Sequence, residues 1–225
     1  MDSTSSRFLH QELIAGHPVT QFVNQNLENL SWKEVLWFAA GLISEQADEL
    51  LFRMEQKAQK FLNTFKLRNL LHWVAQVVDS SEENFKPAAK RAEALRLTIN
   101  RASNLARARA RGPDRIPALA RANDLDEAAI HAGAIIRKLE NTTIPNDKQS
   151  AELSRAFTNR IVQTWYEGLF DPYLLDLSKG ETRSLKNYLY TNELIIRCKT
   201  GAVIVSQKTW DEVENRMLLV MAEDE

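Results

Sequence analysis

Residues 87–113 read PAAKRAEALRLTINRASNLARARARGP, and this stretch decides the fold class. Its apolar side chains recur every three or four residues, which is the spacing of one face of an α-helix. They are Ala88, Ala92, Leu95, Ile99, Ala102 and Leu105 or Ala106. Pro87 suits the first turn of a helix, where no backbone N–H is needed, and Gly112-Pro113 ends the pattern. The stretch therefore predicts one long helix from Pro87 to about Arg111.

The same spacing on both sides of this stretch predicts about eight helices joined by short connections. The other apolar stripes span residues 32–43, 47–65, 67–78, 125–139, 153–169, 178–189 and 206–218. Pro117 is expected to be a further interruption before the helix at 125–139. Antiparallel packing of neighbours is the natural arrangement of such helices. The expected fold is thus an all-α, antiparallel multi-helix array, solenoid-like, with a small C-terminal cap.

Three helix starts are marked by capping residues. Ser31 with Glu34, and Ser178 with Glu181, have the spacing of a capping box, in which each side chain bonds the backbone N–H of the other residue. Ser206 is expected to be the N-cap of the last helix.

Residues 194–205 leave two structures open. Two apolar runs flank Lys199-Thr-Gly201, which is typical of a short β-hairpin. The same residues also fit a helix end, a glycine turn and a connector. We expect three parts of the chain: an N-terminal segment at 1–30 that trails from or docks to a preceding domain, a helical array at 31–145, and a helical cap at 146–225.

Composition limits the class of protein. Charged residues make up 26% of the chain and hydrophobic residues 44%, as in ordinary globular domains. The formal net charge of −1 provides no overall field toward nucleic acid or membranes. A single cysteine, Cys198, allows no internal disulfide and fits a reducing compartment. With no apolar run of about 18 residues and no secretory signal, we expect a cytoplasmic protein with no membrane contact.

The C-terminal segment carries a family resemblance. Its order is a helix, Cys198, a short loop, Val205-Ser206, a second helix and Leu218-Leu219. This order resembles the C-terminal helical module of bacterial NACHT-type signalling NTPases, also called STAND NTPases. Further similar segments are Arg7-Phe-Leu-His10, Ser31-Trp-Lys-Glu-Val35, Leu71-His-Trp-Val74, Lys86–Ala92 and Arg101–Ala110. The resemblance covers residues 31–219, and the tail is its most specific part.

The resemblance implies a non-catalytic function. NACHT proteins are signal-transducing NTPases, and many bacterial members are thought to sense invaders such as phage. Their C-terminal helical regions resemble sensor or autoinhibitory modules. This chain lacks the G-x-x-x-x-G-K-[ST] spacing with which a P-loop holds phosphates. The chain is therefore expected to be either a part of a longer NTPase or a separate module that acts on one, and we expect no cofactor.

Few residues here favour catalysis. Cys198 lies in an apolar run with no histidine marked as its base, so we expect a buried, unreactive thiol. His72 is expected to pack at the edge of the core. One cysteine and four scattered histidines make a poor zinc ligand set. Two more groups are expected to be structural: the carboxylates at 82–83, 124–127 and 223–225 on the surface, and the aromatic residues Phe157, Trp165, Tyr166, Phe170 and Tyr173 in the core.

Arginines gather in one segment. Residues 90–121 contain nine basic and two acidic residues, a local charge of +7, so the remainder of the chain sums to −8. The arginines are Arg91, Arg96, Arg101, Arg107, Arg109, Arg111, Arg115 and Arg121. On a helix, Arg107, Arg109 and Arg111 spread around the last turn, where cations favour the helix dipole. Three interpretations stay open: a solvated or internally paired helix face, a protein-interaction surface, and a nucleic-acid contact.

Three functional hypotheses follow. The first is a non-catalytic sensor or regulatory module that binds a NACHT-type NTPase, in the same chain or in another, in bacterial antiviral defence. The second is a hydrolase-like effector with Cys198 as its nucleophile. The third is a helical nucleic-acid-binding protein that uses residues 91–121.

Overall fold

The computed structural model describes residues 33–42, 47–81, 85–110, 115–140, 147–202 and 204–221. These ranges contain helices, turns and connections but no strand, so the all-α prediction is confirmed. The helices are α3 (Lys33–Leu42), α4 (Ala47–Gln59), α5 (Phe65–Asp79), α6 (Pro87–Arg109), α7 (Arg115–Glu140), α8 (Asp147–Tyr166), α9 (Lys179–Gly201) and α10 (Gln207–Arg216), with a 3₁₀ turn η2 at Pro172–Leu175. No helix among the described residues is long and apolar enough to span a membrane.

Contacts divide the chain into two compact units. One contains residues 61–190 and 218–225, and the other contains residues 1–60 and 191–217. Helix α9 begins in the first unit and ends in the second. The three parts expected from the sequence, 1–30, 31–145 and 146–225, stay a prediction.

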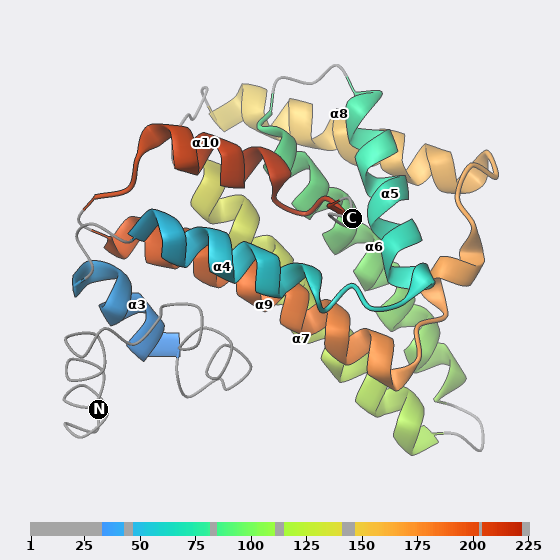
Figure 1. Cartoon of the computed structure of the whole chain (residues 1–225). Coiled ribbons are helices and arrows are strands. Elements are labelled where there is room, and N and C mark those ends of the chain that lie inside the picture. Colours follow the sequence, from blue (N-terminus) through green and yellow to red (C-terminus); the bar gives the residue numbers. More distant parts are fainter. Residues whose placement is uncertain are drawn as a thin grey trace. The chain divides into compact units, whose positions relative to one another are not determined.

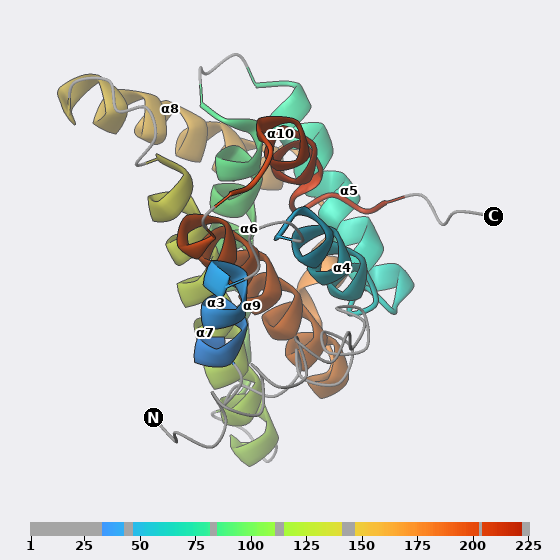
Figure 2. The same ribbon diagram turned by 60° about the vertical axis from the view of Figure 1, so that its left-hand side comes forward.

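The 61–190 unit is built on the pair α6 and α7, which lie side by side and antiparallel (Figure 1). The apolar stripe of α6 is buried as predicted, and Ala106 rather than Leu105 completes it, because Leu105 is 44% exposed. Helix α7 faces it with a row of buried small residues, among them Ala118, Ala122, Ala128 and Ala132. Small side chains on both faces allow the two helix backbones to approach closely. Helix α8 crosses the upper part of this pair (Figure 2).

The start of α7 differs from the prediction. The helix begins at Arg115, ten residues before the expected Leu125, and Pro117 does not interrupt it. Pro117 occupies the first turn, where backbone N–H groups have no partner within the helix. A proline there removes no hydrogen bond, and its fixed φ suits the helix.

The helix expected over residues 47–65 is shorter than predicted. Helix α4 ends at Gln59, and a new helix begins at Phe65, whose side chain is 80% exposed. Thr64 is the N-cap of this new helix, because its hydroxyl accepts a hydrogen bond from the Leu67 N–H. The apolar spacing continues across the break because Leu62 is buried. Periodicity alone therefore could not reveal the cap.

The hairpin alternative for residues 194–205 is wrong. Helix α9 continues to Gly201, and its end is closed by a hydrogen bond from the Ala202 N–H to the Cys198 carbonyl, with a distance of 2.9 Å between N and O. Leu194, Ile195 and Ile196 are all buried. A helix that is covered on several sides shows a continuous apolar run, which resembles a buried strand in sequence.

In the second unit, Asp48 of α4 holds the start of α10. Ser206 is the N-cap of α10, as predicted, and its hydroxyl accepts from the Thr209 N–H. Asp48 accepts the Ser206 N–H through Oδ1 at 2.9 Å and the Thr209 hydroxyl through Oδ2 at 2.8 Å. The carboxylate thereby binds a backbone N–H at the positive end of a helix. Ser31, the serine of the other predicted capping box, lies outside the described residues.

The second unit also requires a glycine at the end of α9. A β-carbon on Gly201 would overlap Nε1 of Trp37 and lie 2.7 Å from its Cδ1, so the indole ring of Trp37 on α3 occupies the space that a side chain would take. The close approach of α3 and α9 thus depends on the missing side chain.

Candidate functional site

The arginine segment lies on α6 and α7, and most of its described members have partners inside the protein. Arg107 donates hydrogen bonds to both carboxylate oxygens of Asp126 on α7. It also donates to Oγ of Ser103 at 2.6 Å, and Ser103 itself donates to Asp126 at 2.7 Å. This triad joins α6 to α7 across their interface.

Arg109 points to a different part of the unit. It forms an ion pair with Asp176, in the connection between η2 and α9. Residues two apart on a helix point in nearly opposite directions, so Arg107 and Arg109 reach different neighbours. The predicted spread of these arginines around the last turn of α6 is therefore observed for these two. Arg111 lies outside the described residues.

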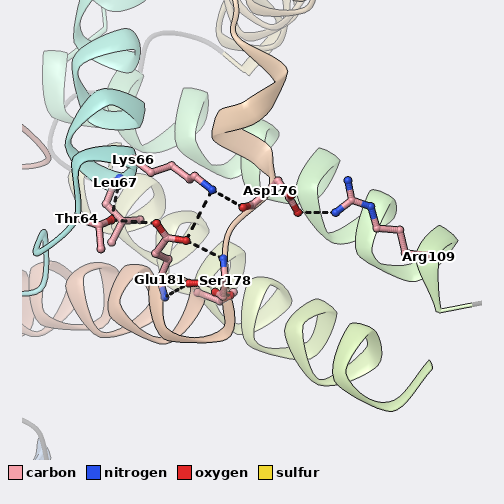
Figure 3. Close-up of polar contacts among 8 residues, drawn as sticks. Thr64, Lys66, Leu67, Arg109, Asp176, Ser178 and Glu181 are labelled. Atoms are coloured by element: carbon pink, nitrogen blue, oxygen red, sulfur yellow. Dashed lines mark hydrogen bonds and ion pairs between the residues drawn. The ribbon is translucent and has the colours of Figure 1, made fainter. Parts of the chain in front are cut away.

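Asp176 belongs to a cluster that we call the polar junction, shown in Figure 3. Its members are Thr64, Lys66, Arg109, Asp176, Ser178 and Glu181. Lys66 of α5 donates to the Asp176 carbonyl at 2.6 Å and lies 3.9 Å from Oε2 of Glu181. Glu181 also accepts the Thr64 hydroxyl at 3.2 Å. The polar junction thus joins the first turn of α5, the last turn of α6 and the first turn of α9.

The capping box at the start of α9 lies at the centre of the polar junction. The Ser178 N–H donates to Glu181 Oε2 at 2.7 Å, and the Glu181 N–H donates to Ser178 Oγ at 3.2 Å. This is the reciprocal pattern predicted from the sequence. Burial by itself would raise the pKa of Glu181, but the hydrogen bonds from Ser178 and the charge of Lys66 lower it overall.

The carboxyl groups that meet Arg107 and Arg109 are held in their charged form. The hydrogen bond from Arg107 lowers the pKa of Asp126, and the hydrogen bond from Arg109 lowers the pKa of Asp176. These aspartates are therefore charged partners of the arginines at neutral pH. Proton transfer by either aspartate near neutral pH is disfavoured, because a general acid or base works best with a pKa near the working pH.

The remaining arginines have varied environments. Arg91 is only 3% exposed, and burial lowers its pKa. Arg96 forms a two-point hydrogen bond with Glu93, at 2.6 and 2.7 Å. The guanidinium of Arg101 lies 4.7 Å from the centroid of the Trp165 ring. Arg115 is exposed, and the charge of Arg121 contributes to the low pKa of Asp176.

Cys198 is buried on α9, as predicted. Burial raises the pKa of its thiol to about 12, although the charge of Arg197 acts in the opposite direction. The described residues contain no group of three histidine, cysteine or acidic side chains that could hold a metal ion.

Two structural expectations need correction. His72 is exposed on α5 instead of packing at the edge of the core, because Leu71 and Trp73 on either side of it already face inward. Among the aromatic residues, Phe157 and Phe170 are buried, but Tyr166 and Tyr173 are 82% and 64% exposed. Both tyrosines lie at or beyond the end of α8, where the helical spacing no longer determines which side faces the core.

Several charged residues of the site were not singled out from the sequence. Lys66 and Asp176 belong to the polar junction, and Lys186 of α9 bonds Asp124 at 2.7 Å and Glu127 at 3.1 Å on α7. The acidic group 124–127 was expected on the surface, and its charges are in fact paired with Lys186 and Arg107. The sequence signal for these pairs was the excess of acidic residues outside residues 90–121. That excess indicates that the arginines have acidic partners, but it does not identify which residues they are.

The aspartate pairs predict a loss of stability in acid. The pKa of Asp126 and of Asp176 lies below the ordinary 3.8 in the folded protein, so their contribution is present above that value. It is lost as the pH falls through the lowered folded-state pKa. We expect the melting temperature to fall between about pH 5 and pH 2, and to fall less in an Arg107→Gln, Arg109→Gln variant. Equal slopes for the two proteins in calorimetry would contradict this assignment.

Comparison with known proteins agrees with the arrangement of the tail. Residues 134–220 match the family model NACHT C-terminal Helical domain 2. The matched segment begins within α7 and includes α8, η2, α9 and α10. No curated protein and no solved structure matches the chain. The helical order around Cys198 and the family model agree, so the resemblance of the tail to a NACHT C-terminal helical module is confirmed over residues 134–220.

Proposed function

We propose that the chain is a non-catalytic regulatory and protein-interaction module of a NACHT-type NTPase, which it binds in the same polypeptide or in another. The match of residues 134–220 to the NACHT C-terminal model carries this proposal. Two observations support it. The sequence has no P-loop, and the carboxylates of Asp126 and Asp176 are used as ion-pair partners of Arg107 and Arg109.

The module would act by differential binding. A regulatory domain shifts an equilibrium between two states of its partner only when it binds one state more tightly than the other. In bacterial antiviral defence, a ligand from the invader would change that difference. We place this function in the cytoplasm.

We place the docking surface at the end of the α6–α7 pair. There Arg115 is exposed, and the neighbouring Ile116 is 81% exposed. Leu105 of α6 and Leu119 of α7 are 44% and 38% exposed. Exposed apolar side chains beside arginine are typical of the centre of protein interfaces. Residues 91–121 would then serve partly to join the helices and partly to bind the partner.

Binding to a NACHT NTPase from the same genome tests the proposal. We expect Ile116→Asp to weaken the complex at least about ten-fold, because a buried charge without a partner is costly. Ile130→Asp is the control, since Ile130 lies on the same helix and is 64% exposed. Titration calorimetry measures both. Where the NTPase shares the polypeptide, the same variants are compared by NTP hydrolysis. No complex and no change in hydrolysis would contradict the proposal.

The nucleic-acid hypothesis predicts a different result. Anisotropy of labelled DNA and RNA would show submicromolar binding that is lost between about 50 and 200 mM salt. We expect no such binding, because Arg107 and Arg109 are neutralised by Asp126 and Asp176.

A further inference from the structure

The 61–190 unit contains a cavity of about 290 Å³ between α6, α7 and α8. None of the exposed residues assigned to the docking surface lines this cavity. Its volume is just below the range of about 300 to 1,000 Å³ that is usual for small-molecule sites, so it suits a small ligand. Ile136, Arg137 and Phe157 of its lining lie within the segment that matches the family model, and the other lining residues precede that segment.

Two small residues keep this space open. Ala89 of α6 and Gly133 of α7 both line it. A β-carbon on Gly133 would lie 3.4 Å from Nη1 of Arg137 and 3.7 Å from Cδ of Arg96. Both arginine side chains therefore extend over the bare backbone of Gly133, which brings two cations from different helices to one wall.

The charge of the lining is positive. Lys90, Arg96 and Arg137 line the cavity together with one carboxylate, Glu93. Glu93 is already bonded at two points to Arg96, and Lys90 donates to Ser81. Arg137 is exposed, and no hydrogen bond or ion pair joins it to another residue whose side chain the structure describes. An exposed guanidinium that lines a cavity is suited to bind an anion.

The rest of the lining is apolar. Phe85, Ile136 and Phe157 form it, and Phe157 is 2% exposed. An inorganic anion would not contact the apolar side chains, and a neutral ring would not pair with the charge of Arg137. The two halves of the lining therefore select a ligand that has an anionic end and a flat apolar body.

We propose that this cavity binds a small phosphate monoester with an aromatic body, the phosphate on Arg137 and Arg96 and the ring against Phe85 and Ile136. The class includes nucleoside monophosphates. The inference does not depend on a NACHT partner, because every residue it uses belongs to the chain itself. In a regulatory module such a ligand would be the signal that the module senses. Its binding is measured on this chain alone, without a partner protein.

Four compounds separate the contributions of the phosphate and of the ring to binding. Calorimetric titration of the full chain is made with adenosine 5′-monophosphate and 1-naphthyl phosphate, with adenosine, and with inorganic phosphate. We expect saturable binding of at least one of the two monoesters, and binding at least about ten-fold weaker for adenosine and for phosphate, since each lacks one half of the interaction. If neither monoester binds, or if phosphate alone binds as tightly, the proposal is wrong.

Matched variants locate the site. Arg137→Gln should weaken monoester binding about ten-fold or more, as the loss of one charge-assisted hydrogen bond does. Glu93→Gln should tighten it, because Arg96 is released and the lining gains positive charge. Arg115→Gln, at an exposed arginine outside the cavity, should change nothing. Unchanged affinity in Arg137→Gln, or equal losses in Arg137→Gln and Arg115→Gln, would overturn the assignment.

Filling the cavity provides a second test. Gly133→Leu places a side chain in the space and should abolish binding, whereas Gly133→Ala adds only a β-carbon at ordinary contact distances and should bind nearly as the natural chain does. Melting curves of both variants check folding. Arg137→Gln keeps the test valid if Gly133→Leu does not fold, because Arg137 is exposed. Full binding by a folded Gly133→Leu variant would contradict the proposal.

Discussion

Replacing Arg216 by methionine is expected to lower the free energy of unfolding by about 3 kcal/mol, the lower end of the range for breaking a buried ion pair. Arg216 donates to both carboxylate oxygens of Glu55, at 3.0 and 2.8 Å. The Glu55 side chain is only 5% exposed, whereas that of Arg216 is 32% exposed. The loss arises because the carboxylate stays buried without its partner. Urea unfolding of the two proteins measures it.

Two comparisons separate this cause from a general loss of contacts. A Glu55→Leu, Arg216→Met double variant should recover most of the stability, since apolar residues often replace a buried ion pair without cost. Arg53→Met is the matched control on α4, because its ion pair with Glu49 is exposed on both sides. Its effect should stay below about 1 kcal/mol. An Arg53→Met loss as large as that of Arg216→Met would contradict the argument.

The raised pKa of Glu55 determines how the loss of stability in Arg216→Met depends on pH. Burial raises the pKa of Glu55 above 4.5 despite the opposing charge of Arg216. For a raised pKa, the contribution to stability is complete below the unfolded value and is lost as the pH rises through the folded value. Without Arg216 the pKa should rise further. The Arg216→Met variant should therefore lose more stability at pH 8 than at pH 4, which is the opposite of the trend expected for Asp126 and Asp176.

Cys198 is expected to react with iodoacetamide at least about a thousand-fold more slowly in the folded protein than in the denatured chain at pH 8. The pKa of the thiol rises from 9.0 to about 12, so the reactive thiolate is about a thousand-fold rarer. Burial of the sulfur slows the reaction further. The rate is measured by mass spectrometry with and without denaturant.

The labelling result decides the hydrolase hypothesis. A nucleophilic cysteine requires a thiolate and a base within hydrogen-bond distance. Rapid labelling of the folded protein would favour that hypothesis and contradict the structural role. Slow labelling that appears only in denaturant would leave Cys198 as a core residue of α9, and a Cys198→Ala variant should then keep the activity of the module.

Local patterns were sufficient for much of the fold. The apolar stripe of α6, the proline at its first turn and the caps at Ser178 and Ser206 each involve residues within a few positions of one another. Their effects are determined by backbone geometry that any surrounding structure preserves. The order of helices and loops around Cys198 is also a pattern of residues close together in the sequence, and it indicated the NACHT resemblance.

The positions of helix ends were less predictable. Pro117 was expected to break a helix and instead lies in the first turn of α7. Thr64 begins a helix within an apolar pattern that continues past it. A proline can either end a helix or stand in its first turn, and a threonine can either continue a helix or cap its start. The packing of the neighbouring side chains decides which of these positions the residue takes.

By itself, then, the sequence determined that this protein is a helical array with a charge-segregated α6–α7 segment and a NACHT-like tail. Only the tertiary structure decided which charges meet. Arg216 pairs with Glu55 across 161 residues, and Arg109 pairs with Asp176 across 67. The cavity beside Gly133 likewise needs side chains from three helices. Such contacts depend on how helices pack, and packing depends on the summed burial of many side chains, which no short pattern records.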